Sequence, residues 1–151
     1  MHDEILTQAQ RDLLPLVASF RKNVGLVGGT AIALHLGHRE SIDFDLFAQT
    51  EFGNLSLQNQ IEQNRHIDKV MVDKLGELTI LLGMVQLTFF HYPFDIDYSE
   101  SFGAVARVPT LLTLAAMKAY ALDHRAKWKD YGDLYFILRD VHPLPEVVDQ
   151  A

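Results

Sequence analysis

Residues 26–47 read LVGGTAIALHLGHRESIDFDLF, and this stretch decides the expected fold. The apolar run over 24–27 predicts a short buried strand that ends at Gly28-Gly29. Residues 30–36 are strongly apolar and predict a short helix, which Gly37 would end. Residues 42–48 predict a second strand. A strand, a turn, a helix and a strand in this order indicate a sheet packed against helices.

Two acidic residues, Asp43 and Asp45, lie on the second predicted strand. Residues two apart on a strand point to the same face, so Ile42, Phe44 and Leu46 would face the core. Two neighbouring carboxylates repel each other, and burial raises their pKa unless a positive charge compensates. Mg²⁺ prefers oxygen ligands and is commonly held by one or two carboxylates together with substrate phosphates. The pair therefore predicts either a metal site or a solvated strand face that carries two acids.

The segment upstream of the acids has features of a phosphate-binding turn. Gly28-Gly29 before a helix lets backbone N–H groups approach a phosphate, and the helix N-terminus favours negative charge; the alternative is a simple tight turn. The hydroxyl of Thr30 would contact the phosphate or cap the helix. Arg39 would neutralise a phosphate or form an ion pair with Glu40 or Asp43.

The rest of the chain predicts further helices and strands. These are a helix over 5–21 that contains Pro15, a helix over 57–65, strands over 67–72, 78–82 and 85–92, an edge strand over 105–108, a helix capped by Thr110 that runs to about 124, and a helix over 128–140. Short turns at 75–77 and 83–84 indicate an antiparallel meander. Residues 94–103 and the tail after 140 read as irregular. The last helix would bury the stripe Tyr131, Leu134, Tyr135 and Leu138. This order predicts a mixed α/β or α+β domain.

Composition limits the classes of function. The chain has 151 residues, a formal net charge of −7 and no cysteine, which fits one globular domain without disulfides or thiolate chemistry. Its apolar runs are too short for a membrane span, and the acidic N-terminus does not resemble a signal peptide, so we expect a cytoplasmic protein. The acidic charge disfavours a large RNA partner. An RNA would need a local basic face, for which the candidates are Lys118, Arg125, Lys127 and Lys129.

The ordered motifs resemble those of a known protein family. The GGT turn followed by DFD is similar to the GG[ST]-then-DxD signature of the polymerase-β-like nucleotidyltransferase superfamily. The run LVGGTAIALHLGHRESIDFDLF more narrowly resembles the AbiEii/AbiGii-type toxin nucleotidyltransferases. VQLTFFHYP resembles that family's third strand, and LLTLAAMKAYALDHRAKWKDYGDLYFIL resembles its helical segment, with a lysine after AAM and a KDxxDLY motif. The resemblance extends from about residue 26 to 138.

The resemblance implies a nucleotidyltransferase-like mixed β-sheet flanked by helices. Residues 1–151 would form one domain, with a core over 24–108 and a C-terminal helical part over 109–140. It implies transfer of a nucleotide from an NTP, with Mg²⁺ or Mn²⁺, to an RNA such as tRNA or to a protein. It also implies a toxin of a toxin–antitoxin or phage-defence pair, with an antitoxin protein as partner.

The resemblance also implies the site residues. The nucleotide would contact Gly28, Gly29, Thr30, Arg39, Ser41 and Lys118; the metal would bind Asp43 and Asp45; the catalytic set would be Asp43, Asp45, Lys118 and Asp130. The residues themselves leave alternatives open. Lys118 would extend along the core with its ammonium group in water, and Asp130 and Asp133 would stabilise the first turn of a helix.

The chain departs from the family pattern at position 88. The family carries a third carboxylate on a neighbouring strand, and the matching position here is Thr88. Other acids that could replace it are Asp73, Glu77, Asp95 and Asp97. Without a third acid, the alternative function is a catalytically degenerate nucleotide- or protein-binding member of the same fold.

Overall fold

A computed structural model describes residues 1–124, 128–140 and 143–150. The strands are β1 (Val24–Val27), β2 (Phe44–Ala48), β3 (Lys69–Lys74), β4 (Glu77–Leu82), β5 (Val85–His91), β6 (Glu100–Phe102) and β7 (Ala106–Val108). The helices are a 3₁₀ turn η1 (Asp3–Ile5), α1 (Gln8–Ser19), α2 (Gly28–Leu36), α3 (Asn54–Glu62), α4 (Leu111–His124), α5 (Trp128–Asp140) and α6 (Leu144–Gln150).

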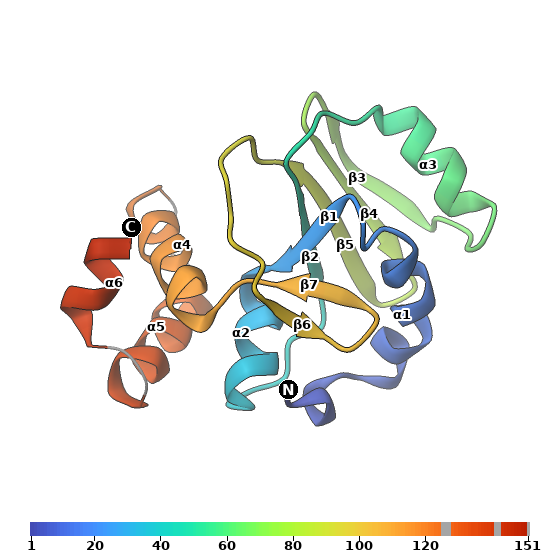
Figure 1. The fold of residues 1–151 in the computed structure, drawn as a ribbon. Coiled ribbons are helices and arrows are strands. Elements are labelled where there is room, and N and C mark those ends of the chain that lie inside the picture. Colours follow the sequence, from blue (N-terminus) through green and yellow to red (C-terminus); the bar gives the residue numbers. More distant parts are fainter. Residues whose placement is uncertain (125–127, 141–142, 151) are drawn as a thin grey trace.

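All the strands belong to one mixed sheet in the order β3-β4-β5-β2-β1-β7-β6 (Figure 1). The pairs β2–β5 and β1–β7 are parallel, and the other neighbours are antiparallel. The antiparallel order β3-β4-β5 confirms the predicted meander. The sheet also confirms the predicted mixed α/β class, with helices beside the sheet and a group of helices at the C-terminus.

One face of the central strands is buried in the core. Phe44, Leu46 and Phe89 on this face are at most 1% exposed, and α1 and α3 contribute apolar side chains to the same cluster. The ring of Phe20, just after α1, meets the ring of Phe89 edge-on at a centroid distance of 5.1 Å. Because side chains alternate along a strand, this burial turns the intervening residues of β2 and β5 to the opposite face.

The start of the β2 segment differs from the expectation. Strand β2 begins at Phe44, so Asp43 precedes it, and Ile42 is 44% exposed rather than part of the core. Helix α2 begins at Gly28 with Val27 at its N-cap and no side-chain cap, so Thr30 does not cap the helix. The predicted end of α2 is confirmed, because Gly37 adopts the left-handed conformation (φ +63°) directly after Leu36.

Other elements also differ in position from their predicted ranges. The first helix is split into η1 and α1, with Pro15 inside α1; α3 lies three residues earlier than predicted and β3 two residues later. Thr110 is confirmed as the residue that caps α4, because its hydroxyl accepts a hydrogen bond from the N–H of Thr113. Strand β7 pairs with both β1 and β6, so the edge strand is β6, inside a segment predicted to be irregular. The tail predicted to be loose contains α6.

The predicted stripe on α5 is confirmed in part, because Leu134 and Leu138 pack against the core but the two tyrosines do not. Tyr131 and Tyr135 are 51% and 58% exposed, whereas Asp130, Asp133 and Ile137 are buried. These three lie at i, i+3 and i+7, so the core-facing side of α5 carries two carboxylates. Burial of two acids requires partners, and the partners form part of the site described below.

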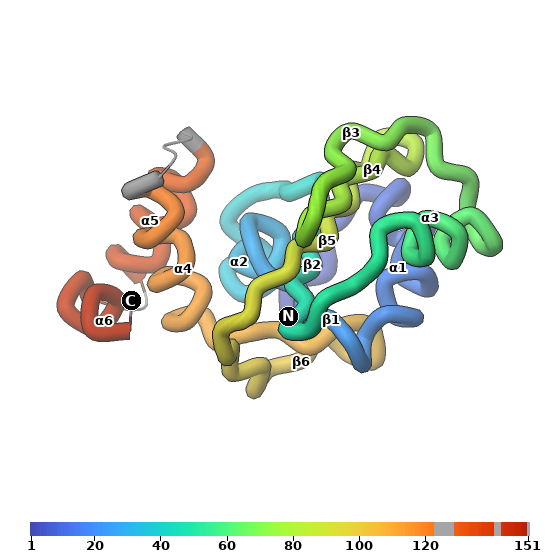
Figure 2. The backbone as a smooth tube through the Cα atoms, turned by 90° about the horizontal axis from the view of Figure 1, so that it is seen from above, coloured from blue at the N-terminus to red at the C-terminus, as the bar shows by residue number. Residues whose placement is uncertain are grey.

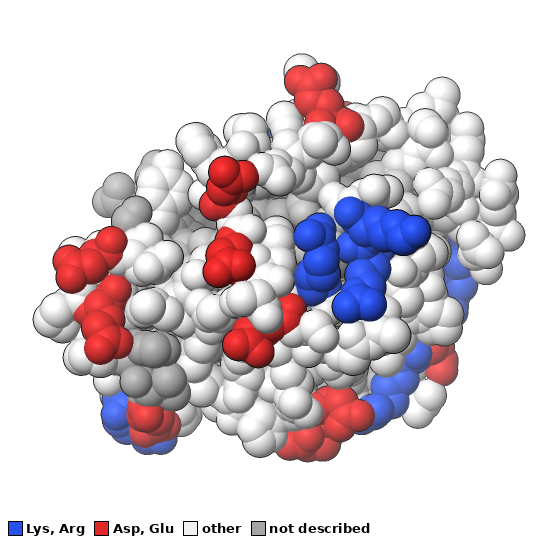
Figure 3. Space-filling view, in the orientation of Figure 1, with Lys and Arg blue, Asp and Glu red and all other residues white. Residues whose placement is uncertain are grey.

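The C-terminal helices α4, α5 and α6 stand together on one side of the molecule (Figure 2). Helices α1 and α3 lie on the opposite side, with β2, β5 and α2 between the two groups. Among the described helices, none is long and apolar enough to cross a membrane. In the view of Figure 3, acidic side chains spread over the side of the C-terminal helices, while a group of Lys and Arg side chains lies closer to the centre.

Candidate functional site

A cavity of about 850 Å³ lies between the C-terminal helices and the sheet face that carries the acid pair. Every residue proposed from the sequence as a site residue, except Thr30, lines it: Gly28, Gly29, Arg39, Ser41, Asp43, Asp45, Lys118 and Asp130. Thr30 lies directly behind the lining and is 2% exposed. The structure thus brings together residues from α2, the segment between α2 and β2, β2, α4 and α5.

The register of β1 and β2 places Asp45 against the Gly-Gly turn. Val27 pairs with Asp45, and a Cβ atom at Gly28 would overlap the Asp45 carboxylate. Gly28 has φ +73°, a conformation that residues with a side chain rarely adopt. Asp43 lines the same cavity, and its Oδ1 accepts a hydrogen bond from the N–H of Gln86 at 3.2 Å. Glycine at position 28 is therefore required both by the backbone and by the approach of Asp45.

The strand beside the acid pair carries hydroxyl groups rather than a third acid. Thr88 on β5 is the register partner of Asp45, and its Oγ1 lies 3.1 Å from Oγ1 of Thr79 on β4. This confirms that position 88 neighbours Asp45. Within the described ranges, no group of three or more His, Asp or Glu side chains is placed to hold a metal ion.

The other acids considered for that role lie elsewhere or have other partners. Asp73 accepts a hydrogen bond from Asn54 at 2.8 Å, and Asp95 accepts one from Gln49. Asp97 is exposed and is not part of the cavity lining. Glu77 lines the cavity but pairs with Lys74 at 3.1 Å.

Hydroxyl groups connect α2 to the segment that leads into β2. The Thr30 hydroxyl donates to the backbone carbonyl of Asp43 and lies 2.8 Å from the hydroxyl of Ser41. Thr30 thereby fixes the backbone directly at Asp43 from within α2. The contacts of Thr30 in this structure hold the acid pair beside the glycine turn.

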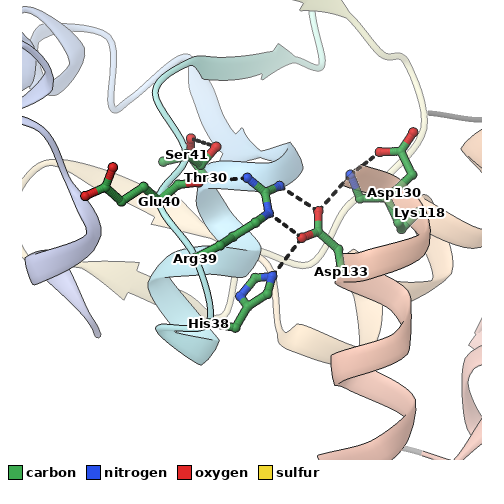
Figure 4. Close-up of polar contacts among 8 residues, drawn as sticks. All are labelled: Thr30, His38, Arg39, Glu40, Ser41, Lys118, Asp130 and Asp133. Atoms are coloured by element: carbon green, nitrogen blue, oxygen red, sulfur yellow. Dashed lines mark hydrogen bonds and ion pairs between the residues drawn. The ribbon is translucent and has the colours of Figure 1, made fainter. Parts of the chain in front are cut away.

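A buried charge cluster joins this segment to the C-terminal helices (Figure 4). Arg39 donates to Asp133 through Nε at 2.8 Å and through Nη2 at 2.9 Å, a bidentate pair. His38 Nε2 lies 2.7 Å from the same carboxylate, whose side chain is fully buried. The sequence suggested Glu40 or Asp43 as ion-pair partners of Arg39, but the partner in the structure is Asp133, 94 residues away.

Lys118 belongs to the same cluster. Its ammonium nitrogen lies 2.6 Å from Oδ1 of Asp130 and 3.2 Å from Oδ2 of Asp133, and its side chain is only 11% exposed. The ammonium group is therefore held by two buried carboxylates rather than extended into water. Oδ2 of Asp130 is buried and has no hydrogen-bond partner in the part of the chain that the structure describes.

The pKa of Asp133 reflects opposing effects. Burial by itself raises the pKa of this carboxyl, but hydrogen bonds from Arg39 and His38 and the charge of Lys118 outweigh burial and hold the pKa below its ordinary value. Asp133 is therefore an ionised, fully enclosed carboxylate in the native protein.

Sequence reasoning missed the roles of His38 and Asp133. Asp130 and Asp133 are three residues apart on a helix, so both point to one side. This spacing, with Lys118 on the preceding helix, was the available signal for a buried charge cluster. Nothing near His38 in the sequence indicates its contact, because its partner is distant in the chain. Of the predicted basic face, Lys129 is exposed and lines the cavity; Arg125 and Lys127 lie outside the described residues.

Comparison with known proteins identifies a relative of similar sequence. It is 31% identical over 142 residues to the uncharacterized protein aq_aa25 of Aquifex aeolicus (strain VF5), across 89% of this chain and 68% of that protein. No protein-family model matches, so membership of the AbiEii/AbiGii family stays a prediction.

Similarity to a solved structure shows the fold. The antibiotic-resistance factor ANT(2'')-Ia superposes with a TM-score of 0.59 at 14% identity, across 93% of this chain and 86% of that one. A CCA-adding enzyme in complex with CTP gives a TM-score of 0.48 at 15% identity, across 97% of this chain and 46% of that one. The chain belongs to the same family as aq_aa25 and has a nucleotidyltransferase-like fold.

Proposed function

We propose that the protein is a metal-dependent nucleotidyltransferase that transfers a nucleotide from an NTP to a hydroxyl group of an acceptor. The observation that carries the proposal is the position of Asp45 against the Gly28 turn, with Asp43 lining the same cavity. Lys118 and Asp130 line this cavity from the opposite side. The arrangement combines a close backbone approach for phosphate, two carboxylates and a cation.

The two carboxylates fit Mg²⁺ or Mn²⁺, because such ions take one or two carboxylates from a protein when substrate phosphates supply further oxygens. The ion, when bound, neutralises phosphate charge. Gly28 and Gly29 present backbone N–H groups to the phosphates at the start of α2. The ammonium group of Lys118 is the positive charge that would contact the phosphates. Arg39 and Ser41 line the same cavity.

In the proposed reaction, the acceptor hydroxyl oxygen attacks the α-phosphorus. The bond between the α-phosphorus and its bridging oxygen to the β-phosphate breaks, and pyrophosphate leaves with the electron pair. The hydroxyl proton passes to the carboxylate of Asp130, which lines the cavity. Positioning and charge neutralisation supply most of the rate in such a transfer.

The resemblance in sequence motifs suggests the biological setting. By analogy with the AbiEii/AbiGii-type toxins, we propose that the acceptor is an RNA such as tRNA or a protein, that an antitoxin is the partner, and that the protein acts in the cytoplasm. Lys129 is the exposed one of the two described members of the basic face, Lys118 and Lys129, and an RNA acceptor would contact it at the cavity.

The test is transfer of label from α-³²P-labelled NTPs, supplied one at a time with Mg²⁺, to total RNA and to a protein extract. We expect labelled product with the wild type and none with Asp45→Asn or after chelation of the metal. Asp12→Asn removes an exposed carboxylate on α1, outside the cavity, and serves as the matched control with full activity. Undiminished transfer by an Asp43→Asn, Asp45→Asn double variant would contradict the metal assignment.

A second function is favoured by Thr88. A hydroxyl beside Asp45, bonded to Thr79, replaces the acid expected at that position, and a threonine is a poor Mg²⁺ ligand. A catalytically degenerate member would bind a metal–NTP complex without transfer. Calorimetric titration with each Mg–NTP, in parallel with the labelling assay, separates the two functions: binding without labelled product favours the second.

A further inference from the structure

An aromatic row continues the face of the sheet that carries the acid pair. Phe47 follows Asp45 by two residues on β2, and Phe90 follows Thr88 by two residues on β5; Phe47 and Phe90 are register partners, as are Asp45 and Thr88. Residues two apart on a strand share a face, about 7 Å apart. Phe47, Phe90 and Tyr92 line the same cavity as Asp45.

The rings of this row contact one another. The centroid of the Phe47 ring lies 5.3 Å from that of Phe90 and 5.3 Å from that of Tyr92, and the ring of Tyr92 lies 5.2 Å from that of Phe94. Phe47, Phe90 and Tyr92 are partly exposed, unlike the buried side chains that alternate with them. The sheet therefore presents a preformed aromatic surface to the cavity.

The end of the row toward β1 is closed by another aromatic side chain. Gly25 is the register partner of Phe47 on β1, and a Cβ atom at Gly25 would overlap the ring of Tyr98. Tyr98 thus fills the space above Gly25. Tyr98 therefore lies beside the row at Phe47. On the other side, the register partner of Phe90 is Glu77 on β4, which also lines the cavity.

We propose that Phe47, Phe90 and Tyr92 form a stacking surface for a nucleobase that belongs either to the NTP or to the nucleotide at the end of an RNA acceptor. The inference rests on the proposed function, because Phe47 lies two residues from Asp45 on the same face of β2, next to the proposed phosphate site. Every nucleobase has a planar π-face, and stacking on aromatic side chains holds unpaired bases with little dependence on sequence. Partly exposed rings in contact suit this role because they need no rearrangement to accept a base.

The test measures binding of three probes to Phe90→Leu and Phe47→Leu. The probes are the four Mg–NTPs, inorganic triphosphate with Mg²⁺, and single-stranded RNA trinucleotides of one base type that carry no triphosphate. Leucine keeps apolar volume and removes the planar face. Phe52→Leu is the matched control, because Phe52 packs against Phe89 on the core side and does not line the cavity.

We expect Phe90→Leu to weaken binding of NTPs or of trinucleotides about tenfold and to leave inorganic triphosphate unchanged. Loss for the NTPs alone assigns the surface to the NTP base; loss for the trinucleotides alone assigns it to the acceptor. The proposal is overturned if Phe90→Leu loses as much affinity for inorganic triphosphate as for the base-containing probes, or if Phe52→Leu loses as much affinity as Phe90→Leu. It is also overturned if neither base-containing probe loses affinity in Phe90→Leu, or if neither binds the wild type. Failure of the proposed function gives a different result. In that case Asp45→Asn would bind Mg²⁺-triphosphate as tightly as the wild type does, and the trinucleotides would still measure binding of a base to the aromatic surface.

Discussion

Asp133 is fully buried and contacts Arg39, His38 and Lys118, three side chains from two other segments of the chain. Removal of one partner from a buried ion pair leaves uncompensated charge in a low-dielectric environment. Loss of the Asp133 carboxylate would therefore leave the positive charges of Arg39 and Lys118 without this buried counter-charge.

Asp133→Asn is predicted to lower the free energy of unfolding by about 3–5 kcal/mol, because the guanidinium of Arg39 and the ammonium of Lys118 lose a buried counter-charge. Denaturation by urea at pH 7 measures the change. Asp140→Asn, on the same helix but in an exposed pair with Arg139, is the control and should leave the midpoint unchanged. Similar midpoints for the two variants would contradict the prediction.

Tyr98 is predicted to ionise late. Burial raises the pKa of its phenol to about 12, against a smaller opposing effect of the Arg107 guanidinium, which lies 5.1 Å from the ring centroid. A pKa raised above the unfolded value of 10.0 contributes stability that is fully present below pH 10 and is lost as the pH rises toward 12.

Absorbance at 295 nm during an alkaline titration measures this ionisation. One of the five tyrosines should titrate in a separate late phase, and Tyr98→Phe should remove that phase. Tyr131→Phe, which removes a half-exposed phenol on α5, should keep it. A late phase that survives in Tyr98→Phe would show that another tyrosine is responsible.

At the scale of elements, the turn from β1 into α2 sets the site. Gly28 and Gly83 both have positive φ, of 73° and 61°, but only Gly28 has neighbours within reach of a Cβ atom. The two glycines therefore separate the effect of backbone conformation from the effect of close approach.

Gly83→Ala is predicted to lose about 1–2 kcal/mol of stability, because alanine is strained at positive φ, and Gly28→Ala is predicted to lose at least as much because its Cβ also meets Asp45. Only Gly28→Ala should also weaken binding of Mg–triphosphate, by about tenfold or more, since its Cβ displaces the Asp45 carboxylate. Thermal unfolding and calorimetric titration of both variants check this. Equal affinities would contradict the assignment of the turn to phosphate.

At the scale of the whole molecule, the charge cluster connects α4 and α5 to the segment between α2 and β2, and the cavity lies between these parts. A ligand in the cavity contacts elements from both halves of the chain. Binding should therefore stabilise the molecule as a unit, because a ligand that binds only the native state shifts the unfolding equilibrium.

At a free Mg–NTP concentration of 100 times Kd, the stabilisation is predicted to be about 2.7 kcal/mol, which raises Tm by about 5–10 °C for a domain of this size. Differential scanning fluorimetry with each NTP measures the shift. Asp12→Asn should keep the shift and Asp45→Asn should lose it. A shift of equal size in Asp45→Asn would place the nucleotide elsewhere.

The sequence by itself determined the class of the fold and most of the elements, but not β6 or α6. Local patterns are enough for this: apolar runs beside glycines predicted β1, the end of α2 and the β3-β4-β5 meander, and Thr110 was recognisable as a cap because a cap acts within three residues. The sequence also predicted that the GGT turn and the DFD segment lie close together, because only one short helix and a short connection separate them.

Only the tertiary structure decided the partners of the buried charges and the position of the aromatic row. Arg39 and Asp133 are 94 residues apart, and Phe47 and Phe90 meet only because β2 and β5 pair in parallel. The pattern on α5 predicted buried tyrosines. In the structure Asp130 and Asp133 are buried instead, because ion pairs with Arg39 and Lys118 offset the cost of burying them. A sequence specifies such pairs through the register of distant segments, and that register exists only once the chain has folded.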